Sequence, residues 1–167
     1  MRHIYTLVIV FLFSVVMKAE VSVAEKKALI QLYKSTNGAN WTSKWDLTAP
    51  VSSWYGVQIN ADKVVAIDLE KNNLVGILPS SIGDLKYLES LNLSFNKIAG
   101  AIPASIGDLS SLKSLSMFMN FFSGKLPDEI GKLSRLEVLS LYNNDIEGQI
   151  PSSIYELNNL KVLYLNS

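Results

Sequence analysis

Few side chains in this chain of 167 residues have the types and spacing that catalysis requires. The chain has no cysteine and one histidine, His3, so a thiolate nucleophile and a histidine-based acid, base or metal ligand are not expected. Asp84 and Asp108 are 24 residues apart, and Lys132 follows after the same interval. We interpret these as solvated surface charges, because a hydrolytic carboxylate pair needs a cleft and a perturbed environment. The sequence predicts no enzyme, no cofactor and no metal site.

The charge balance argues against a nucleic-acid partner. The chain carries 15 basic and 15 acidic residues. A nucleic-acid-binding protein usually shows a basic excess gathered on one face, and no basic cluster is evident.

Residues of four types recur with a fixed period from Val64 onward. A period of this length with the pattern L-x-x-L-x-L-x-x-N indicates a solenoid built from stacked coils. The recurring residues, each 24 from the last, are Asn72, Asn96, Asn120 and Asn144; Gly76, Gly100, Gly124 and Gly148; Pro79, Pro103, Pro127 and Pro151; and Leu85, Leu109, Leu133 and Leu157.

Each position in the period has a structural role. The alternating segment Leu91-Asn92-Leu93 predicts a short strand whose leucines point into a core. An Asn at the end of the strand has one acceptor and two donors for buried backbone groups, so the Asn column is expected to form a ladder. The S-S-I-G-D-L type segment after each proline predicts a single 3-10 or helical turn on the outer face.

The repeat from Leu91 to Gly107 resembles the plant-type leucine-rich-repeat family, whose hallmark is N-x-L-x-G-x-I-P-x-x-I/L-G. That repeat occurs in the extracellular parts of plant receptor kinases, receptor-like proteins and polygalacturonase inhibitors. The resemblance covers residues 22–167. It implies an α/β solenoid, a right-handed superhelix with a parallel concave β-sheet of about five short strands. It also implies 3-10 or short helical turns on the convex side and a helical N-terminal cap.

Residues 22–35 predict the helix of that cap. Ser22 and Glu25 fit a capping box, and Gly38 is expected to end the helix in a left-handed conformation. The expected apolar face consists of Val23, Leu29, Ile30, Leu32 and Tyr33, with Glu25 on the polar face.

Trp41, Trp45 and Trp54 follow the cap helix closely. They either form a sugar-binding platform or plug the open end of the core, and we favour the plug because terminal repeats need a cap. Ser52 and Ile59 stand where the family has its two cap cysteines. A cysteine-free cap resembles those of algal, protist and bacterial surface or secreted proteins.

The chain is expected to begin with a signal peptide, residues 1–19, followed by the cap, residues 20–63, and the repeats, residues 64–167. The apolar run from Ile4 to Met17 is shorter than a membrane span and fits a signal-peptide core. Cleavage after Ala24 and an uncleaved anchor are the alternatives. The mature segment is therefore expected to be secreted or at the cell surface, with no membrane span.

In this architecture the residues between the strand leucines project onto the concave face. Phe95, Phe118, Met119, Tyr142 and Tyr164 would make an apolar-aromatic stripe there, unless ordinary repeat variation placed them. The residues expected to bind a ligand are Asp68, Glu70, Asn92, Ser94, Phe95, Ser116, Phe118, Met119, Ser140, Tyr142, Asn143 and Tyr164.

The expected function is that of an exported binding module for a protein, a peptide or a polysaccharide. Two alternatives remain. The chain ends inside the strand of a fifth turn without a polar cap, which fits the N-terminal piece of a larger receptor-like protein. By analogy with the polygalacturonase inhibitors, it could instead inhibit an extracellular glycosidase.

Overall fold

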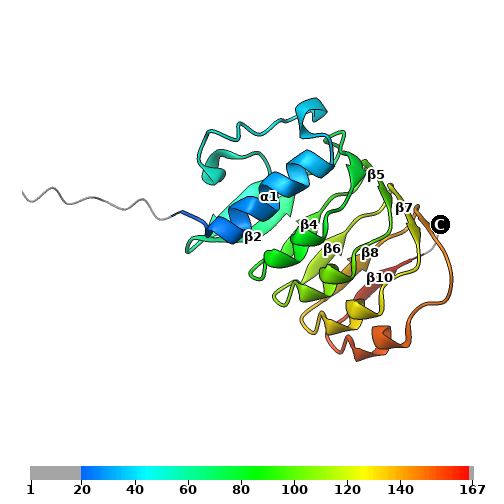
Figure 1. The fold of residues 1–167 in the computed structure, drawn as a ribbon. Helices are drawn as coiled ribbons and strands as arrows, with labels where there is room; N and C mark the ends of the chain where they lie inside the picture. Colours follow the sequence, from blue (N-terminus) through cyan, green and yellow to red (C-terminus); the bar gives the residue numbers. More distant parts are fainter. Residues whose placement is uncertain (1–19, 166–167) are drawn as a thin grey trace, which may run out of the picture.

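The computed structural model describes residues 20–165, which form a row of stacked coils behind one N-terminal helix (Figure 1). Each coil contributes a strand to a large sheet, a strand to a smaller sheet and a 3-10 turn. The expected signal peptide, residues 1–19, lies outside the described residues.

The large sheet contains the five parallel strands that the resemblance implies. Equivalent residues pair in register, so that Leu91 lies opposite Leu115 and Leu115 opposite Leu139. A sixth strand, β1 (Val57–Asn60), was not expected; it pairs antiparallel with β2 and covers the first edge of the sheet. The parallel strands, in spatial order, are β2 (Lys63–Asp68), β4 (Ser90–Asn92), β6 (Ser114–Ser116), β8 (Val138–Ser140) and β10 (Val162–Tyr164).

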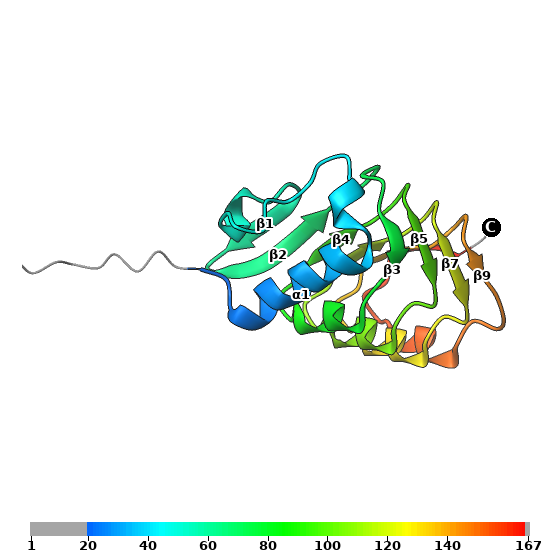
Figure 2. The ribbon, with the colours of Figure 1, turned by 45° about the horizontal axis from the view of Figure 1, so that its top comes forward.

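A second, four-stranded sheet runs along another side of the coils (Figure 2). Its strands are parallel and also follow chain order, one per coil. The sequence analysis did not foresee this sheet. Its strands are β3 (Val75–Ile77), β5 (Lys97–Gly100), β7 (Phe121–Gly124) and β9 (Asp145–Ile146).

The outer side of each coil is a 3-10 turn that follows an extended proline, as expected. Successive turns lie close together, because a Cβ on Gly83 or Gly107 would meet the carbonyl oxygen of the next coil, from Ser105 or Glu129. This close approach explains why glycine also recurs every 24 residues at Gly83, Gly107 and Gly131. The turns are η3 (Ser80–Asp84), η4 (Ala104–Asp108), η5 (Asp128–Lys132) and η6 (Ser152–Glu156).

The asparagine ladder is confirmed. The side chain of Asn120 accepts a hydrogen bond from the backbone N–H of Ile98 at 3.0 Å and donates to the carbonyl oxygens of Leu93 and Met117 at 2.9 and 3.1 Å. Asn96 and Asn144 make equivalent bonds one coil away on either side. Each amide thus joins two coils and satisfies backbone groups that no strand pairs.

At the first coil, Asn72 extends this ladder to the cap. Its side-chain oxygen accepts a hydrogen bond from the N–H of Ser43, and its side-chain nitrogen donates to the Ser43 carbonyl at 3.3 Å. Residues 72 and 43 are thereby held together across the junction of cap and repeats.

The cap helix α1 (Val23–Ser35) begins with the expected capping box between Ser22 and Glu25. Two expectations about its faces are wrong. Val23 is 86% exposed, whereas Glu25 is only 3% exposed. The Glu25 carboxylate is buried because it also accepts a hydrogen bond, at 3.0 Å, from the backbone N–H of Val64 in β2. This bond ties the start of the helix to the first strand of the repeats.

The expected role of Gly38 is wrong as well. The left-handed residue after α1 is Asn37, with φ 57° and ψ 49°, and Gly38 begins the short turn η1 (Gly38–Asn40). Gly38 is needed for space, because a Cβ there would collide with the ring of Tyr33. Asn tolerates the left-handed region better than most residues, so Asn37 can end the helix in its place.

The three tryptophans are buried at the N-terminal end of the core. Trp41, Trp45 and Trp54 are at most 4% exposed, and Trp45 stacks on Trp54 with ring centroids 4.8 Å apart. Each indole N–H donates to a backbone carbonyl, those of Thr36, Tyr55 and Asp46 respectively. Buried rings with satisfied donors cannot serve as a sugar platform, so the plug interpretation is confirmed.

Candidate functional site

The face of the large sheet that points away from the core carries the residues expected to bind a ligand. Because the strands pair in register, side chains at equivalent positions form rows that cross the sheet from coil to coil. One row follows the strand ends, and a second follows two residues later. The first row is Asp68, Asn92, Ser116, Ser140 and Tyr164, and the second is Glu70, Ser94, Phe118 and Tyr142.

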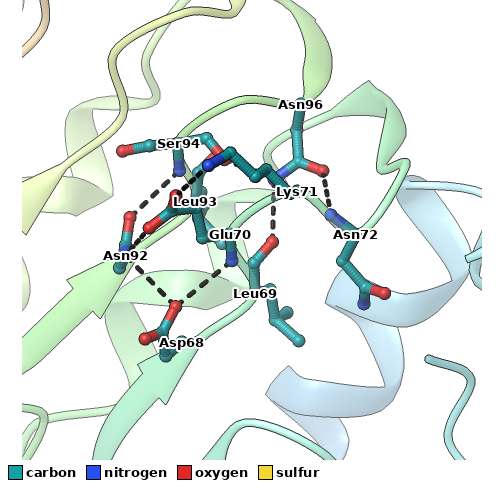
Figure 3. A network of polar contacts seen from close by, with 9 residues as sticks. All are labelled: Asp68, Leu69, Glu70, Lys71, Asn72, Asn92, Leu93, Ser94 and Asn96. Atoms are coloured by element: carbon teal, nitrogen blue, oxygen red, sulfur yellow. Dashed lines mark hydrogen bonds and ion pairs between the residues drawn. The ribbon is translucent and has the colours of Figure 1, made fainter. Parts of the chain in front are cut away.

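A polar network occupies the first two coils of this face (Figure 3). The amide nitrogen of Asn92 donates to the carboxylates of Asp68 and Glu70, at 3.1 and 3.2 Å. Glu70 also forms an ion pair with Lys71, at 3.2 Å. The Lys71 ammonium lies 4.5 Å from the centre of the Phe95 ring, so the network ends against an aromatic side chain.

Aromatic side chains occupy the remaining coils and form a continuous chain of ring contacts, here called the aromatic ladder: Phe95, Phe118, Tyr142 and Tyr164. Phe95 meets Phe118 edge to face at 5.1 Å, and Phe118 stacks on Tyr142 at 4.5 Å with the ring planes 9° apart. Tyr142 meets Tyr164 edge to face at 6.1 Å. The stripe expected from the sequence is therefore a set of mutually supporting rings.

Two of the expected ligand-binding residues do not reach this surface. Ser94 is fully buried and Ser140 is 5% exposed. Both are short side chains; Ser94 stands between the larger Glu70 and Phe118, and Ser140 lies next to the larger Tyr164. The expectation that they present their hydroxyls on the concave face is wrong. The other ten residues keep partly or fully exposed side chains.

One residue per coil, just before the ladder asparagine, has a left-handed backbone: Lys71, Phe95, Met119 and Asn143, with φ of 52–56°. The N–H of each of the first three bonds to a carbonyl of the next coil, such as that of Phe118 for Phe95 at 3.0 Å. These bonds hold the conformation in place. The left-handed conformation costs more backbone energy for bulky residues such as Phe95 and Met119 than for Asn143.

The outward face of the second sheet carries apolar residues that the sequence analysis missed. Ile77 and Phe121 are 59% and 55% exposed, and Ala99 pairs with both of them across the sheet. Alternation of exposed and buried residues, as in Lys97-Ile98-Ala99, could have indicated this strand. Alternation predicts that a strand is present, however, but not on which side of the coil the strand lies.

Two lysine–glutamate pairs link adjacent coils just before the strands of the large sheet. Lys113 pairs with Glu89 at 2.7 Å and Lys161 with Glu137 at 2.6 Å, both one coil apart. The hydrogen bond and charge of Lys161 lower the pKa of the Glu137 carboxyl below its ordinary 4.5. Within residues 20–165, no group of three or more His, Asp or Glu side chains is placed to hold a metal ion.

Comparison with known proteins agrees with this architecture. Two models described as leucine-rich repeat match residues 62–122 and 135–157. Polygalacturonase inhibitor 1 of Arabidopsis thaliana is 31% identical over 71 residues, which is 40% of this chain and 22% of the inhibitor.

Among solved structures, the crystal structure of PEPR1-AtPEP1 superposes with a TM-score of 0.78 and 33% identity over 86% of this chain and 21% of that one. A second match is the LRR ectodomain of the Arabidopsis thaliana membrane receptor kinase GASSHO1/SCHENGEN3, solved in complex with CASPARIAN STRIP INTEGRITY FACTOR 2. It gives a TM-score of 0.78 at 27% identity over 84% of this chain and 18% of that one.

The chain thus spans about a fifth of the length of these relatives. In residues 20–165, no helix is long and apolar enough to cross a membrane. One of these relatives is a receptor-kinase ectodomain solved in complex with CASPARIAN STRIP INTEGRITY FACTOR 2, and another is a polygalacturonase inhibitor. The chain belongs to the leucine-rich-repeat family, in its plant-type form.

Proposed function

We propose that this chain is an exported binding module that recognises a protein or peptide through the aromatic ladder of its concave face. The observation that carries the proposal is the unbroken contact of Phe95, Phe118, Tyr142 and Tyr164 across four coils. Aromatic side chains are enriched where proteins bind proteins, because they bury a large area with few rotatable bonds.

The geometry of the ladder favours a polypeptide over a polysaccharide as the ligand. Sugars bind aromatic residues through an exposed ring face, yet Phe118 and Tyr142 cover each other's faces at 4.5 Å. The stacked pair therefore leaves fewer ring faces free for a sugar. A polypeptide can place apolar side chains against the rings and hydrogen-bond the polar network beside them.

Selection from a phage-displayed library of random peptides on the immobilised protein tests the proposal. Selected peptides are expected to lose at least about tenfold in affinity for the double variant Phe118→Ala plus Tyr142→Ala. Tyr155→Ala is the matched control, because Tyr155 is an aromatic residue that is 87% exposed on η6, outside the concave face. Selected peptides that bind the double variant unchanged, or a failure to select any, would contradict the proposal.

Inhibition of an extracellular glycosidase is a second candidate, favoured by the similarity to polygalacturonase inhibitor 1. We would measure polygalacturonase turnover with increasing amounts of the protein. Concentration-dependent inhibition that Tyr142→Ala removes would support this function on the same face. Unchanged turnover at a large excess of the protein would rule it out.

Export and the extent of the whole protein are parts of the same proposal. Relatives of this chain include receptor ectodomains several times its length, so a larger receptor-like protein is the alternative to a small stand-alone binder. N-terminal sequencing of the protein from culture medium should give a chain that starts at Glu20. Sequencing of the gene downstream of codon 167 distinguishes the two forms.

A further inference from the structure

A groove lies at the rim where the concave sheet meets the second sheet. It has a volume of about 420 Å³, in the range of small-ligand sites, which is roughly 300–1,000 Å³. Three exposed apolar side chains line it, those of Phe95, Met119 and Phe121. They are 38%, 40% and 55% exposed.

Two of these apolar residues have a strained backbone conformation. Phe95 and Met119 have φ of 55° and 56°, in the left-handed region that bulky side chains avoid. Backbone strain of this kind concentrates at binding sites when the surrounding hydrogen bonds fix it. The equivalent residue of the next coil, Asn143, occupies the same conformation with a residue type suited to it.

The floor of the groove offers a ligand no hydrogen bonds. Asn96 and Asn120 lie there, and their side-chain amides are already bonded to backbone groups of two coils. A ligand would therefore be held on this floor by apolar contact alone. Any polar contact with the ligand must therefore come from side chains at the edge of the groove.

Lys97 is the charged side chain that lines the groove. Its ammonium donates to the neutral side-chain oxygen of Asn73, at 3.3 Å. Across residues 20–165 no carboxylate lies within 4.0 Å of it, in contrast to the ion-paired Lys71, Lys86, Lys113 and Lys161. Asp145, in β9, lies beyond Phe121 and does not line the groove. The positive charge at one end is thus left without a carboxylate partner.

We propose that this rim groove, formed by Phe95, Lys97, Met119 and Phe121, is a second binding site, which shares only Phe95 with the aromatic ladder. Its ligand is a partner segment in which an aromatic or aliphatic side chain stands next to a carboxylate. The apolar side chain lies against Met119 and Phe121, and the carboxylate pairs with the Lys97 ammonium. The negative charge of Asp145 disfavours the opposite orientation.

N-acetyl-phenylalanine is a minimal probe for this site, and its uncharged amide is the matched comparison. Titration of each into the isotope-labelled protein, followed by NMR, is expected to shift the signals of Lys97, Met119 and Phe121. The acid should bind about two- to fivefold more tightly than the amide, the range of an exposed ion pair. Added salt should reduce this preference.

Variants separate the two parts of the site. Lys97→Gln is expected to weaken the acid to the level of the amide, while Lys86→Gln, an exposed lysine on the outer side, leaves the preference unchanged. Phe121→Ser should weaken acid and amide alike, and Tyr155→Ser should weaken neither. Equal binding of acid and amide, shifts confined to other surfaces, or no binding would overturn the proposal. Tyr142 does not line the rim groove, so Tyr142→Ala should leave binding of the probe unchanged. A failure of the rim-groove proposal can therefore be told apart from a failure of the proposed concave-face function.

Discussion

The amide of Asn120 connects two coils, because it bonds backbone groups of Leu93 and Ile98 in one coil and of Met117 in the next. Asn120→Ala would leave the buried N–H of Ile98 without a partner, whereas the Leu93 and Met117 carbonyls keep their bonds from Asn96 and Asn144. An unsatisfied buried group costs about 1–3 kcal/mol. We expect the variant to lose about 1–3 kcal/mol of unfolding free energy, measured by urea denaturation. Asn158→Ala, which removes one exposed local hydrogen bond, is the control and should change little.

Met119 allows a test of the strain at the rim. Met119→Asn places in the third coil the residue type that Asn143 supplies in the fourth, in the same left-handed conformation. The variant should be more stable than the parent by about 0.5–1 kcal/mol, because Asn adopts this region more easily. A loss of stability would show that burial of the Met119 side chain outweighs the backbone strain.

At the scale of elements, the parallel strands are held in register by ion pairs as well as by backbone bonds. Glu137 at the start of β8 pairs with Lys161 at the start of β10, and this pair lowers the pKa of Glu137. A carboxyl with a lowered folded-state pKa stabilises the fold above its unfolded pKa and loses that contribution as the pH falls through the folded value.

The pairing therefore predicts a pH-dependent difference between the parent and Glu137→Gln. The parent should be the more stable of the two near neutral pH, and the difference should shrink as the pH falls below 4.5, the ordinary value. Thermal denaturation at a series of pH values measures it. Because the pair is exposed, salt should reduce the difference too. A difference independent of pH would mean that Glu137 acts through packing.

At the scale of the whole molecule, the solenoid is quasi-one-dimensional, since each coil contacts only its neighbours. Its N-terminal end is closed by β1 and by the packed rings of Trp41, Trp45 and Trp54. Opening this end should expose the core of the first coil before that of later coils. The cap is thus expected to set the stability of the adjacent repeats.

Trp45→Ala tests this dependence, because Trp45 contacts Tyr33, Trp41 and Trp54. We expect a loss of about 3–5 kcal/mol. Hydrogen exchange should show the largest loss of protection in α1 and β2 and a smaller loss toward β8. Tyr55→Ala, at a side chain that is 52% exposed, serves as the control. Uniform loss of protection along the chain would point to a single cooperative unit instead.

The sequence by itself determined the repeat, the buried leucine columns, the asparagine ladder and the capping box of Ser22. These features depend on periodicity and on local hydrogen-bonding chemistry, both of which are written in residue types and spacing. It also placed Phe95, Phe118, Tyr142 and Tyr164 on one face, because they come from the strand segments of successive coils and those strands lie side by side in one parallel sheet.

Tertiary structure alone decided which of those residues reach the surface and which contacts they make. Ser94 is buried because its neighbours in the row are larger, and Glu25 is buried because the backbone of Val64 lies above it. The second sheet, and with it the rim groove beside Lys97, arises where the left-handed residues turn the chain. Such features depend on how successive coils stack, and a repeat pattern specifies the coil but not the side chains that its neighbours cover.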